Sequence, residues 1–296
     1  MIIKDFGEFL DCLTFANFFS IIKVMEPSRV ITLTTDFGLH DPYVAMMKGV
    51  ILSINSKARI VDISHQIRAG TIIRAAGFLH EAFSFFPKNT IHVAVVDPGV
   101  GTERRLIGLE ARNHFFVGPD NGIFWPIIED SEEVKITHLT NKVYFRPRIS
   151  HTFHGRDVFA PVAAHLSLGV DLEKMGAQIN DPRPLLYPKS QKKDDTLYGE
   201  IMRVDNFGNL ITNIHGRDLD SFLESARPII EVGDLVIGKL SPIYADVDQG
   251  EPLALINSSD WLEIAVYLGR ASQYTGLGLE EIFGAEVRVK KAKEPL

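Results

Sequence analysis

The chain has 296 residues and a formal net charge of −7, with 45% hydrophobic and 23% charged residues. This composition is typical of a globular protein with its own core, and the negative charge argues against nucleic acid or an anionic membrane as a partner. The single cysteine, Cys12, excludes an internal disulfide and a cysteine-based zinc site. It fits a reducing compartment, so we expect a cytoplasmic protein.

Residues 1–28 are expected to be an N-terminal extension. The segment is rich in phenylalanine but contains Glu8 and Asp11, and it has neither a basic leader nor a small-residue cleavage site. It therefore does not fit a signal peptide, and it is too short and too charged for a membrane-spanning helix. We expect an amphipathic helix that docks on the body of the protein or on a neighbouring subunit.

Strand and helix patterns alternate over residues 29–180. Three short runs rich in β-branched residues predict strands, at 30–35, 59–64 and 90–96, and apolar periodicity predicts helices at 43–54 and 71–86. This alternation predicts an α/β domain with a mainly parallel sheet. A hairpin is expected at 106–118, around Arg112 and Asn113, and a last helix at 157–169.

The pattern changes at residues 181–196. This segment contains three prolines and a run of charges and fits no periodic pattern, so we interpret it as a linker. Seven short strand patterns separated by turns follow in residues 197–296. They predict a smaller, all-β antiparallel domain with a barrel-like shape.

Each of the three predicted α/β strands ends at or next to an acid: Asp36, Asp62 or Asp97. Ligands of α/β sheets bind beyond the carboxyl ends of the strands. A turn or a helix cap explains one such acid, whereas three in corresponding places point to a site. A carboxylate at the end of a buried strand needs a partner. The glycine-rich turn after Asp97 can bring Arg104 or Arg105 back over it.

His154 precedes a glycine and the start of the last predicted helix, which is a common place for a reactive side chain, although a lone loop histidine is more often only hydrogen-bonded. A two-metal hydrolase site is an alternative, with oxygen and imidazole ligands from Asp36, Asp62, His65, Asp97, Asp120 and His154. The sequence has no HxH or HExxH pair and no phosphate-binding loop. We therefore expect no metal.

Six motifs follow one another in a recognisable order: TLTTDFGLHDPYVAMMKG, IVDISH, VVDPGVGTERR, PDNGIF, TFHGRDVFAPVAAHL and VDNFGNLITNI. Together they resemble the S-adenosyl-L-methionine (SAM) hydroxide adenosyltransferases, SAM hydrolases that are relatives of fluorinase and chlorinase. The resemblance runs from about Ile31 to the C-terminus. It implies an α/β domain followed by a barrel-like β domain, in agreement with the pattern analysis.

The resemblance also implies an activity. The expected reaction is in-line attack of water or hydroxide on C5′ of the SAM ribose, which yields adenosine and L-methionine with no cofactor and no metal. The expected assembly is a homotrimer, with SAM held between the N-terminal domain of one subunit and the C-terminal domain of the next.

Matching the family motifs residue by residue assigns roles to eight side chains. The set that holds the attacking water falls on Asp97, Arg104 and His154. The substrate-binding residues are Asp36 for the ribose hydroxyls, Asp205 for the methionine ammonium, Asn209 and Phe207 for the adenine, and Ser258 for the methionine carboxylate.

Three other functions use the same residues. A halogenase-type reaction is disfavoured because a carboxylate at ~4 Å repels a halide by about 4 kcal/mol when the effective dielectric constant is about 20. A SAM- or adenosine-binding regulator with little turnover is the second alternative, and a metal-dependent phosphoesterase is the third. Product analysis and sensitivity to a chelator separate these functions from SAM hydrolysis.

Overall fold

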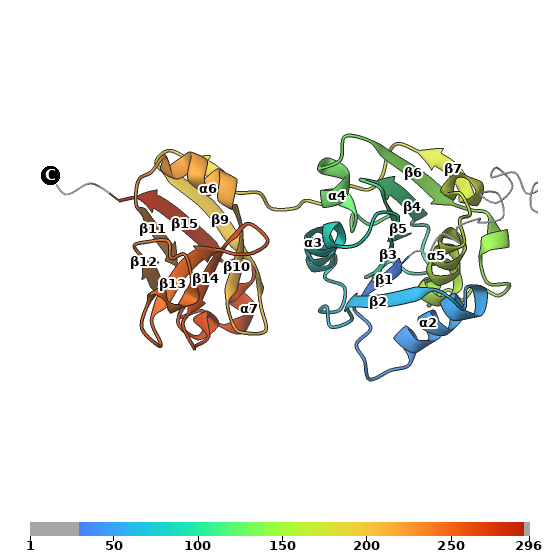
Figure 1. Cartoon of the computed structure of the whole chain (residues 1–296), viewed down its shortest axis with the longest axis horizontal. Helices are drawn as coiled ribbons and strands as arrows, with labels where there is room; N and C mark the ends of the chain where they lie inside the picture. Colours follow the sequence, from blue (N-terminus) through green and yellow to red (C-terminus); the bar gives the residue numbers. More distant parts are fainter. Residues whose placement is uncertain (1–29, 293–296) are drawn as a thin grey trace, which may run out of the picture. The chain divides into compact units, whose positions relative to one another are not determined.

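The computed structural model describes residues 30–292. The expected N-terminal extension at residues 1–28, with Cys12, therefore lies outside the described residues. The chain divides between Leu185 and Leu186 into two compact units, which we call the α/β unit and the β unit. Each unit has its own sheet (Figure 1).

The sheet of the α/β unit has seven strands in the order β2-β1-β3-β5-β4-β6-β7. Their bounds are β1 Val30–Thr35, β2 Arg59–Ser64, β3 Ile91–Val95, β4 Leu106–Ala111, β5 His114–Pro119, β6 Val134–Leu139 and β7 Gly176–Ile179. The central strands β1 and β3 are buried on both faces, which explains why their sequences are runs of apolar and β-branched residues.

This sheet is mixed, so the prediction of a mainly parallel sheet was wrong. β1 is parallel to β2 and β3, and β3 is parallel to β5. β4 is antiparallel to β5 and β6, and β6 is antiparallel to β7. The reason is the predicted hairpin: Arg112 and Asn113 both have positive φ (51° and 63°), as a tight two-residue turn requires. Such a turn joins only antiparallel strands, and β6 then continues that pattern.

Helices cover both faces of the sheet (Figure 1). The helices are α2 Tyr43–Ile54, α3 Ile72–Ala82, α4 Trp125–Glu129 and α5 Ala160–Ser167, with shorter turns at Phe83–Phe85, Lys142–Tyr144, Gly155–Phe159 and Leu172–Met175. α2 has the predicted bounds, and it buries Val44, Met47 and Ile51, which share one helical face. α2 and α5 pack on one face of the sheet, and α3 and α4 pack on the other.

The β unit is built on an antiparallel sheet in the order β12-β11-β15-β9-β10-β14-β13, with β8 paired to β9. Its strands are β8 Gln191–Lys193, β9 Thr196–Val204, β10 Leu210–His215, β11 Pro228–Val232, β12 Leu235–Ile237, β13 Pro252–Ile256, β14 Trp261–Val266 and β15 Glu286–Lys291. A bridge between Leu240, just beyond β12, and Ala254 of β13 brings the two edges together. The sheet is thus nearly closed, which confirms the barrel-like prediction.

The β unit also contains helices, so the prediction of an all-β domain was incomplete. α6 spans Gly216–Leu223, α7 spans Leu279–Ile282, and one-turn helices lie at Tyr244–Asp246 and Ala271–Gln273. α6 buries Leu219, Phe222 and Leu223 against the barrel core. The strand β8 lies within the segment 181–196 that the sequence analysis interprets as a linker. Over residues 30–292, no helix has the length and apolar character needed to cross a membrane.

His92 of β3 is fully buried in the α/β unit. Its Nδ1 lies 2.8 Å from Thr32 Oγ1, its Nε2 lies 3.2 Å from His114 Nδ1, and its ring stacks on Phe116. Burial, reinforced by the nearby His114, lowers the pKa of His92 to about 3. His92 is therefore neutral in the folded protein at pH values where it is protonated in the unfolded chain.

We expect this histidine to make the fold sensitive to acid. The unfolded chain takes up a proton below its pKa of about 6.5, whereas folded His92 does so only near its pKa of about 3, so the free energy of unfolding falls as the pH falls through this window. The contribution lost between pH 7 and pH 5 is about 2 kcal/mol. Urea unfolding at both pH values should show a larger drop for the wild type than for His92→Leu. Equal drops would contradict the prediction.

Candidate active site

A cavity of about 310 Å³ lies at the carboxyl ends of β1 and β3 in the α/β unit. Its lining comes from four segments: Asp36 and Phe37 after β1, Ala69 and Gly70 before α3, Val95, Asp97, Pro98 and Val100 around the end of β3, and Thr152, Phe153, His154 and Gly155 before α5. A larger open hollow of about 530 Å³, next to the β4–β5 turn, contains none of the predicted site residues.

Asp97 and Arg104 form a buried ion pair at this cavity. Arg104 Nε donates to Asp97 Oδ1 at 2.7 Å, and Arg104 Nη2 donates to Asp97 Oδ2 in a shorter contact. The two side chains are only 4% and 6% exposed. Gly101 has a φ of +81°, and a side chain there would clash with the backbone carbonyl of His151. The glycine-rich turn therefore returns Arg104 to Asp97 and packs against the segment that carries His154.

Arg105, the other arginine that the sequence analysis considered for Asp97, points elsewhere. Its Nε donates to Asp120 Oδ2 and its Nη1 donates to Asp181 Oδ1, both at 2.7 Å. Asp62 is likewise outside the cavity, where it pairs with Lys48 at 2.6 Å and lies 3.1 Å from His65 Nε2. Of the six ligands of the two-metal alternative, Asp62, His65 and Asp120 therefore do not line this cavity. Within residues 30–292, no group of three or more histidine, cysteine, aspartate or glutamate side chains is arranged to hold a metal ion.

His154 extends the ion pair into a three-residue chain. Its Nδ1 lies 2.9 Å from Arg104 Nη2. A guanidinium group can only donate hydrogen bonds, so Nδ1 must accept, and the proton of the neutral ring lies on Nε2. Burial, followed by the positive charge of Arg104, lowers the pKa of His154 below the ordinary value of 6.5. His154 is therefore a neutral imidazole at neutral pH, with its tautomer set by Arg104.

Asp36 faces the same cavity from the end of β1. Its Oδ2 accepts a hydrogen bond of 2.8 Å from the backbone N–H of Gly70. Gly70 has a φ of +73°, and a Cβ there would lie 3.3 Å from Pro98 Cγ. The loops that follow β1, precede α3 and follow β3 are thus held close together, which places the Asp36 and Asp97 carboxylates in the wall of one cavity.

An aromatic cluster forms the apolar side of the cavity, and the sequence analysis did not identify it. The ring centroids of Phe37 and Phe153 are 5.7 Å apart, those of Tyr43 and Phe153 are 5.3 Å apart, and Phe37 and Phe153 line the cavity. The available signal was position: Phe37 follows Asp36 directly, and Phe153 precedes His154. An apolar wall next to carboxylates suits a ligand that combines rings or a sulfonium with hydroxyl groups.

In the β unit, Asp205 and Asn209 close one turn between β9 and β10. Asp205 Oδ1 accepts from the backbone N–H groups of Phe207 and Asn209, both at 2.8 Å, and the Asn209 amide donates to Asp205 Oδ2 at 3.2 Å. Phe207 is 72% exposed at the tip of this turn. Ser258 is exposed in a different turn, between β13 and β14. The structure thus brings Asp205, Phe207 and Asn209 together in one turn and places Ser258 in another.

A buried glutamate in β14 fixes the second turn. Glu263 accepts from Tyr244 Oη at 2.7 Å and from Asn257 Nδ2 at 3.2 Å, and Asn257 Oδ1 accepts from the backbone N–H groups of Ser259 and Trp261. Burial, the bond to Glu263 and the negative charge of Asp205 raise the pKa of Tyr244. The sequence analysis missed this network, although a single acid inside the apolar run WLEIAV was a signal for it.

Comparison with protein families shows to which family the chain belongs. The model of the SAM hydroxide adenosyltransferase N-terminal domain matches residues 31–176, and the model of the C-terminal domain of the same family matches residues 199–283. The chain belongs to the SAM hydroxide adenosyltransferase family. The family predicted from the six sequence motifs is thereby confirmed.

Among relatives in this family, proteins named (R)-S-adenosyl-L-methionine hydrolase are similar over most of their length. The protein from Salinispora tropica is 36% identical over 264 residues, which cover 86% of this chain and 96% of the relative. The protein from Methanocaldococcus jannaschii is 35% identical over 266 residues, covering 86% and 94%. A fluorinase from an Actinoplanes species is 27% identical over 269 residues, covering 80% and 90%. The hydrolases are thus more similar to this chain than this fluorinase is.

A solved structure supports the fold of this family member. An uncharacterized conserved protein from Thermotoga maritima is 35% identical, has a TM-score of 0.82, and matches 88% of this chain and 100% of its own. Of the eight residues to which the resemblance gives roles, Asp36, Asp97 and His154 line one cavity, and Arg104 bonds to two of them.

Proposed function

We propose that the protein hydrolyses SAM to adenosine and L-methionine, and that Asp97, Arg104 and His154 hold the oxygen nucleophile. The observation that carries this proposal is the buried Asp97–Arg104–His154 chain at the wall of the cavity. Membership of the family and similarity of 35–37% to proteins named SAM hydrolases support it.

The geometry favours different roles for Asp97 and His154. His154 Nδ1 accepts from Arg104, so its Nε2–H is a donor and cannot take a proton from water. Each Asp97 oxygen accepts one hydrogen bond from Arg104 and keeps a further lone pair. Asp97 is therefore the proton acceptor, and His154 orients the oxygen.

The reaction itself needs little acid help. The sulfonium of SAM is a good leaving group, so the main task is to hold an oxygen in line with the C5′–S bond in a site that excludes bulk water. As water attacks C5′, the C5′–O bond forms, the C5′–S bond breaks, and its electron pair leaves with methionine. The proton lost by the water passes to Asp97. The two hydrogen bonds from Arg104 hold Asp97 in the orientation needed for that transfer.

The pairing of Asp97 with Arg104 changes how the carboxylate acts on a halide ion. The Arg104 guanidinium pairs with Asp97 through two hydrogen bonds, so the full repulsion of a bare carboxylate does not apply. What separates the nucleophiles is hydrogen bonding: water can donate to the Asp97 oxygens, whereas a halide ion has no proton to donate. We therefore propose water as the nucleophile.

The rest of the substrate is assigned to the remaining predicted residues. We propose that Asp36 accepts hydrogen bonds from the ribose hydroxyls, because its carboxylate lines the same cavity as Asp97. In the β unit, Asp205 binds the methionine ammonium, Asn209 and the exposed ring of Phe207 bind adenine, and Ser258 binds the methionine carboxylate. Family resemblance supports these four roles.

We also propose that the protein is a cytoplasmic homotrimer in which SAM contacts the α/β unit of one subunit and the β unit of the next. Family resemblance supports this assembly, and the single cysteine supports the compartment. Mixing Asp97→Asn protein with Asn209→Ala protein, each of which we expect to have low activity alone, under exchange conditions tests the shared site. Activity should return because some mixed trimers contain an intact site. No recovery in trimers that have exchanged subunits would contradict the arrangement.

Product chromatography tests the function directly. Purified protein is incubated with the separated sulfonium epimers of SAM, with and without high chloride, in the presence of a chelator. We expect adenosine and methionine in equal amounts under all salt conditions, formed from the epimer that the relatives' name specifies. A 5′-chlorinated nucleoside would show a halogenase, loss of activity in chelator would show a metal enzyme, and tight binding without product would show a regulator.

The pH dependence of turnover should report on His154. Its lowered pKa keeps the ring neutral below pH 6.5, so kcat should stay constant through pH 6.5 and fall only as the pH drops through that lowered pKa. Protonation places a hydrogen on Nδ1, which then faces Arg104 Nη2 and breaks the chain. A kcat profile from pH 5 to 9 measures this. A fall centred at or above pH 6.5 would contradict the assigned state of His154.

A further inference from the structure

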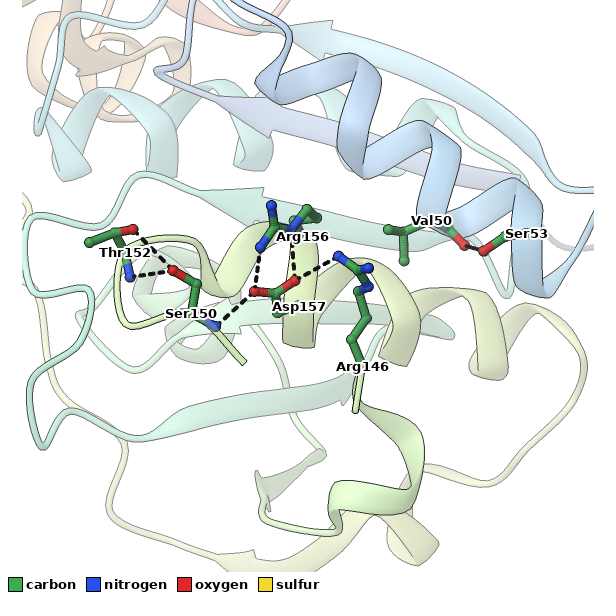
Figure 2. Close-up of polar contacts among 7 residues, drawn as sticks. All are labelled: Val50, Ser53, Arg146, Ser150, Thr152, Arg156 and Asp157. Carbon is green, nitrogen blue, oxygen red and sulfur yellow. Dashed lines mark hydrogen bonds and ion pairs between the residues drawn. The ribbon is translucent and has the colours of Figure 1, made fainter. Parts of the chain in front are cut away.

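Asp157 is a fully buried carboxylate that does not line the cavity. Arg156 donates to it through Nε at 2.7 Å and through Nη2 at 2.8 Å, and Arg146 Nη1 donates at 3.1 Å. The backbone N–H of Ser150 donates to its second oxygen at 2.9 Å. Figure 2 shows the carboxylate enclosed by these donors. Two arginines and a backbone amide thus converge on a group that has no part in the reaction described above.

The backbone of Asp157 also forms two hydrogen bonds within residues 146–157. The N–H of Arg146 donates to the carbonyl oxygen of Asp157 at 2.9 Å, and the N–H of Asp157 donates to the carbonyl oxygen of Phe153 at 3.1 Å. Asp157 therefore ties together the two ends of residues 146–157. This segment carries His154 and the cavity-lining residue Phe153.

Two further contacts lead from Asp157 to the cavity wall. Ser150, whose N–H binds Asp157, has its hydroxyl 3.1 Å from that of Thr152, which lines the cavity (Figure 2). The guanidinium of Arg156 lies over the ring of Phe153, 5.0 Å from its centroid. The bonds of Asp157 thus constrain the residues on either side of His154.

The local backbone conformation explains why the residues around His154 need these contacts. His154 immediately precedes a π-helical turn, Gly155–Phe159, which contains Asp157 and leads into α5. A π turn is rarer and less favourable than an α turn, and it persists where surrounding contacts hold it. A buried, charged network is costly to desolvate, so it adds little to stability compared with apolar packing. Its hydrogen bonds are satisfied in only one arrangement of the donor groups, so it fixes the positions of the residues that carry them.

We propose that Asp157 is a positioning residue of the reaction: its carboxylate, held by Arg146, Arg156 and the Ser150 amide, fixes the segment that places His154 against Arg104. This inference rests on the proposed role of His154. Because the imidazole orients the nucleophile through one hydrogen bond, a displacement of the segment by an ångström removes the alignment without removing any group that touches SAM.

The test is Asp157→Asn, which keeps the shape of the side chain but places an amide NH₂ among hydrogen-bond donors. We expect kcat for SAM to fall about 10- to 100-fold, while KM rises by no more than about threefold. The matched control is Asp171→Asn, which removes the same charge from an exposed carboxylate paired with Lys174. A kcat for Asp157→Asn within twofold of that control would overturn the proposal.

The pKa of the His154 imidazole, measured by NMR, gives a readout that needs no turnover. The charged and titratable groups that act on it are Arg104, Asp97, His151 and Asp157. Removing the negative charge of Asp157 without any movement lowers this pKa. Displacement of the ring from Arg104 into water raises it toward 6.5. We expect a rise, and a fall or no change would overturn the proposal even if the wild type failed to hydrolyse SAM.

Two more variants separate positioning from stability. Ser167→Ala, in α5, removes the buried hydrogen bond that Ser167 accepts from Asn55 and the one that it donates to the Ala164 carbonyl, without touching residues 146–157. Ser167→Ala should lower the Tm but leave kcat unchanged. If Ser167→Ala and Asp157→Asn lowered the Tm equally and also lowered kcat equally, Asp157 would act through stability alone. If Asp157→Asn does not fold, Arg146→Gln removes one donor from a side chain that is 44% exposed. It should raise the His154 pKa and lower kcat to a smaller extent, and no effect on either would overturn the proposal.

Discussion

Replacing Asp97 with asparagine should lower kcat for SAM hydrolysis about a thousandfold and leave the Kd for SAM within a few-fold of wild type. A general base contributes roughly 10²- to 10⁴-fold to a reaction rate, and the asparagine amide cannot accept the proton of the attacking water. The substrate contacts assigned to Asp36 and to the β unit are untouched by the change. Single-turnover product analysis gives the rate, and calorimetry gives the affinity.

Asp120→Asn provides a matched control for that experiment. Asp120 is a second carboxylate with a side chain only 4% exposed, and it accepts one hydrogen bond from the adjacent arginine, Arg105. Breaking this pair removes a buried carboxylate partner from Arg105, which keeps its bond to Asp181, and the change lies outside the cavity. We expect a comparable loss of Tm and nearly normal kcat. If both variants lost turnover equally, or if Asp97→Asn kept it with binding intact, Asp97 would not be the base.

Replacing Asp36 with alanine should instead weaken the binding of SAM and of adenosine by about 100-fold. A hydrogen bond to a charged group contributes about 1.5–3 kcal/mol, and 2.7 kcal/mol corresponds to about two orders of magnitude in Kd. The Asp36 carboxylate is held by the Gly70 amide and faces the cavity, so it is oriented before the ligand arrives. Calorimetry with adenosine measures the effect without turnover.

A ligand lacking the ribose hydroxyls sharpens this test. 2′,3′-Dideoxyadenosine should bind wild type and Asp36→Ala with the same Kd, because the contact that the substitution removes is already absent. Asp41→Ala, which removes an exposed acid five residues away, should leave the Kd for adenosine unchanged. If the substitution weakened the dideoxy ligand as strongly as adenosine, Asp36 would act on something other than the hydroxyls.

These two predictions assign separate tasks to two acids that look alike in the sequence. Asp36 and Asp97 both follow a central strand and both face one cavity. Their partners differ: Asp36 is held by an uncharged backbone amide, and Asp97 is held by a guanidinium. The guanidinium holds the Asp97 carboxylate in a fixed orientation and leaves lone pairs on its oxygens for water. The backbone amide leaves the Asp36 carboxylate able to accept hydrogen bonds from the neutral ribose hydroxyls.

The sequence by itself determined the parts of this protein that depend on local periodicity and on chain order. Burial of one helical face requires apolar residues at i, i+3 and i+4, and burial of a central strand requires a continuous apolar run. α2, the first strands, the 106–118 hairpin and the seven strands from β9 to β15 were therefore readable. The order of six motifs was specific enough to identify the family, which the family models confirm.

The tertiary structure alone decided which side chains meet. The sequence analysis predicted β4 as a strand of the hairpin but made no prediction for β6, so the antiparallel pairing of β4 with β6 is known only from the structure. Arg104 and Arg105 are adjacent in sequence, yet they reach Asp97 and Asp120 respectively. The bond from Arg104 to His154, the ties that hold Asp157 and the burial of Glu263 depend on the path of the chain between distant elements. A hydrogen bond requires placement within about an ångström, and residue order does not specify that.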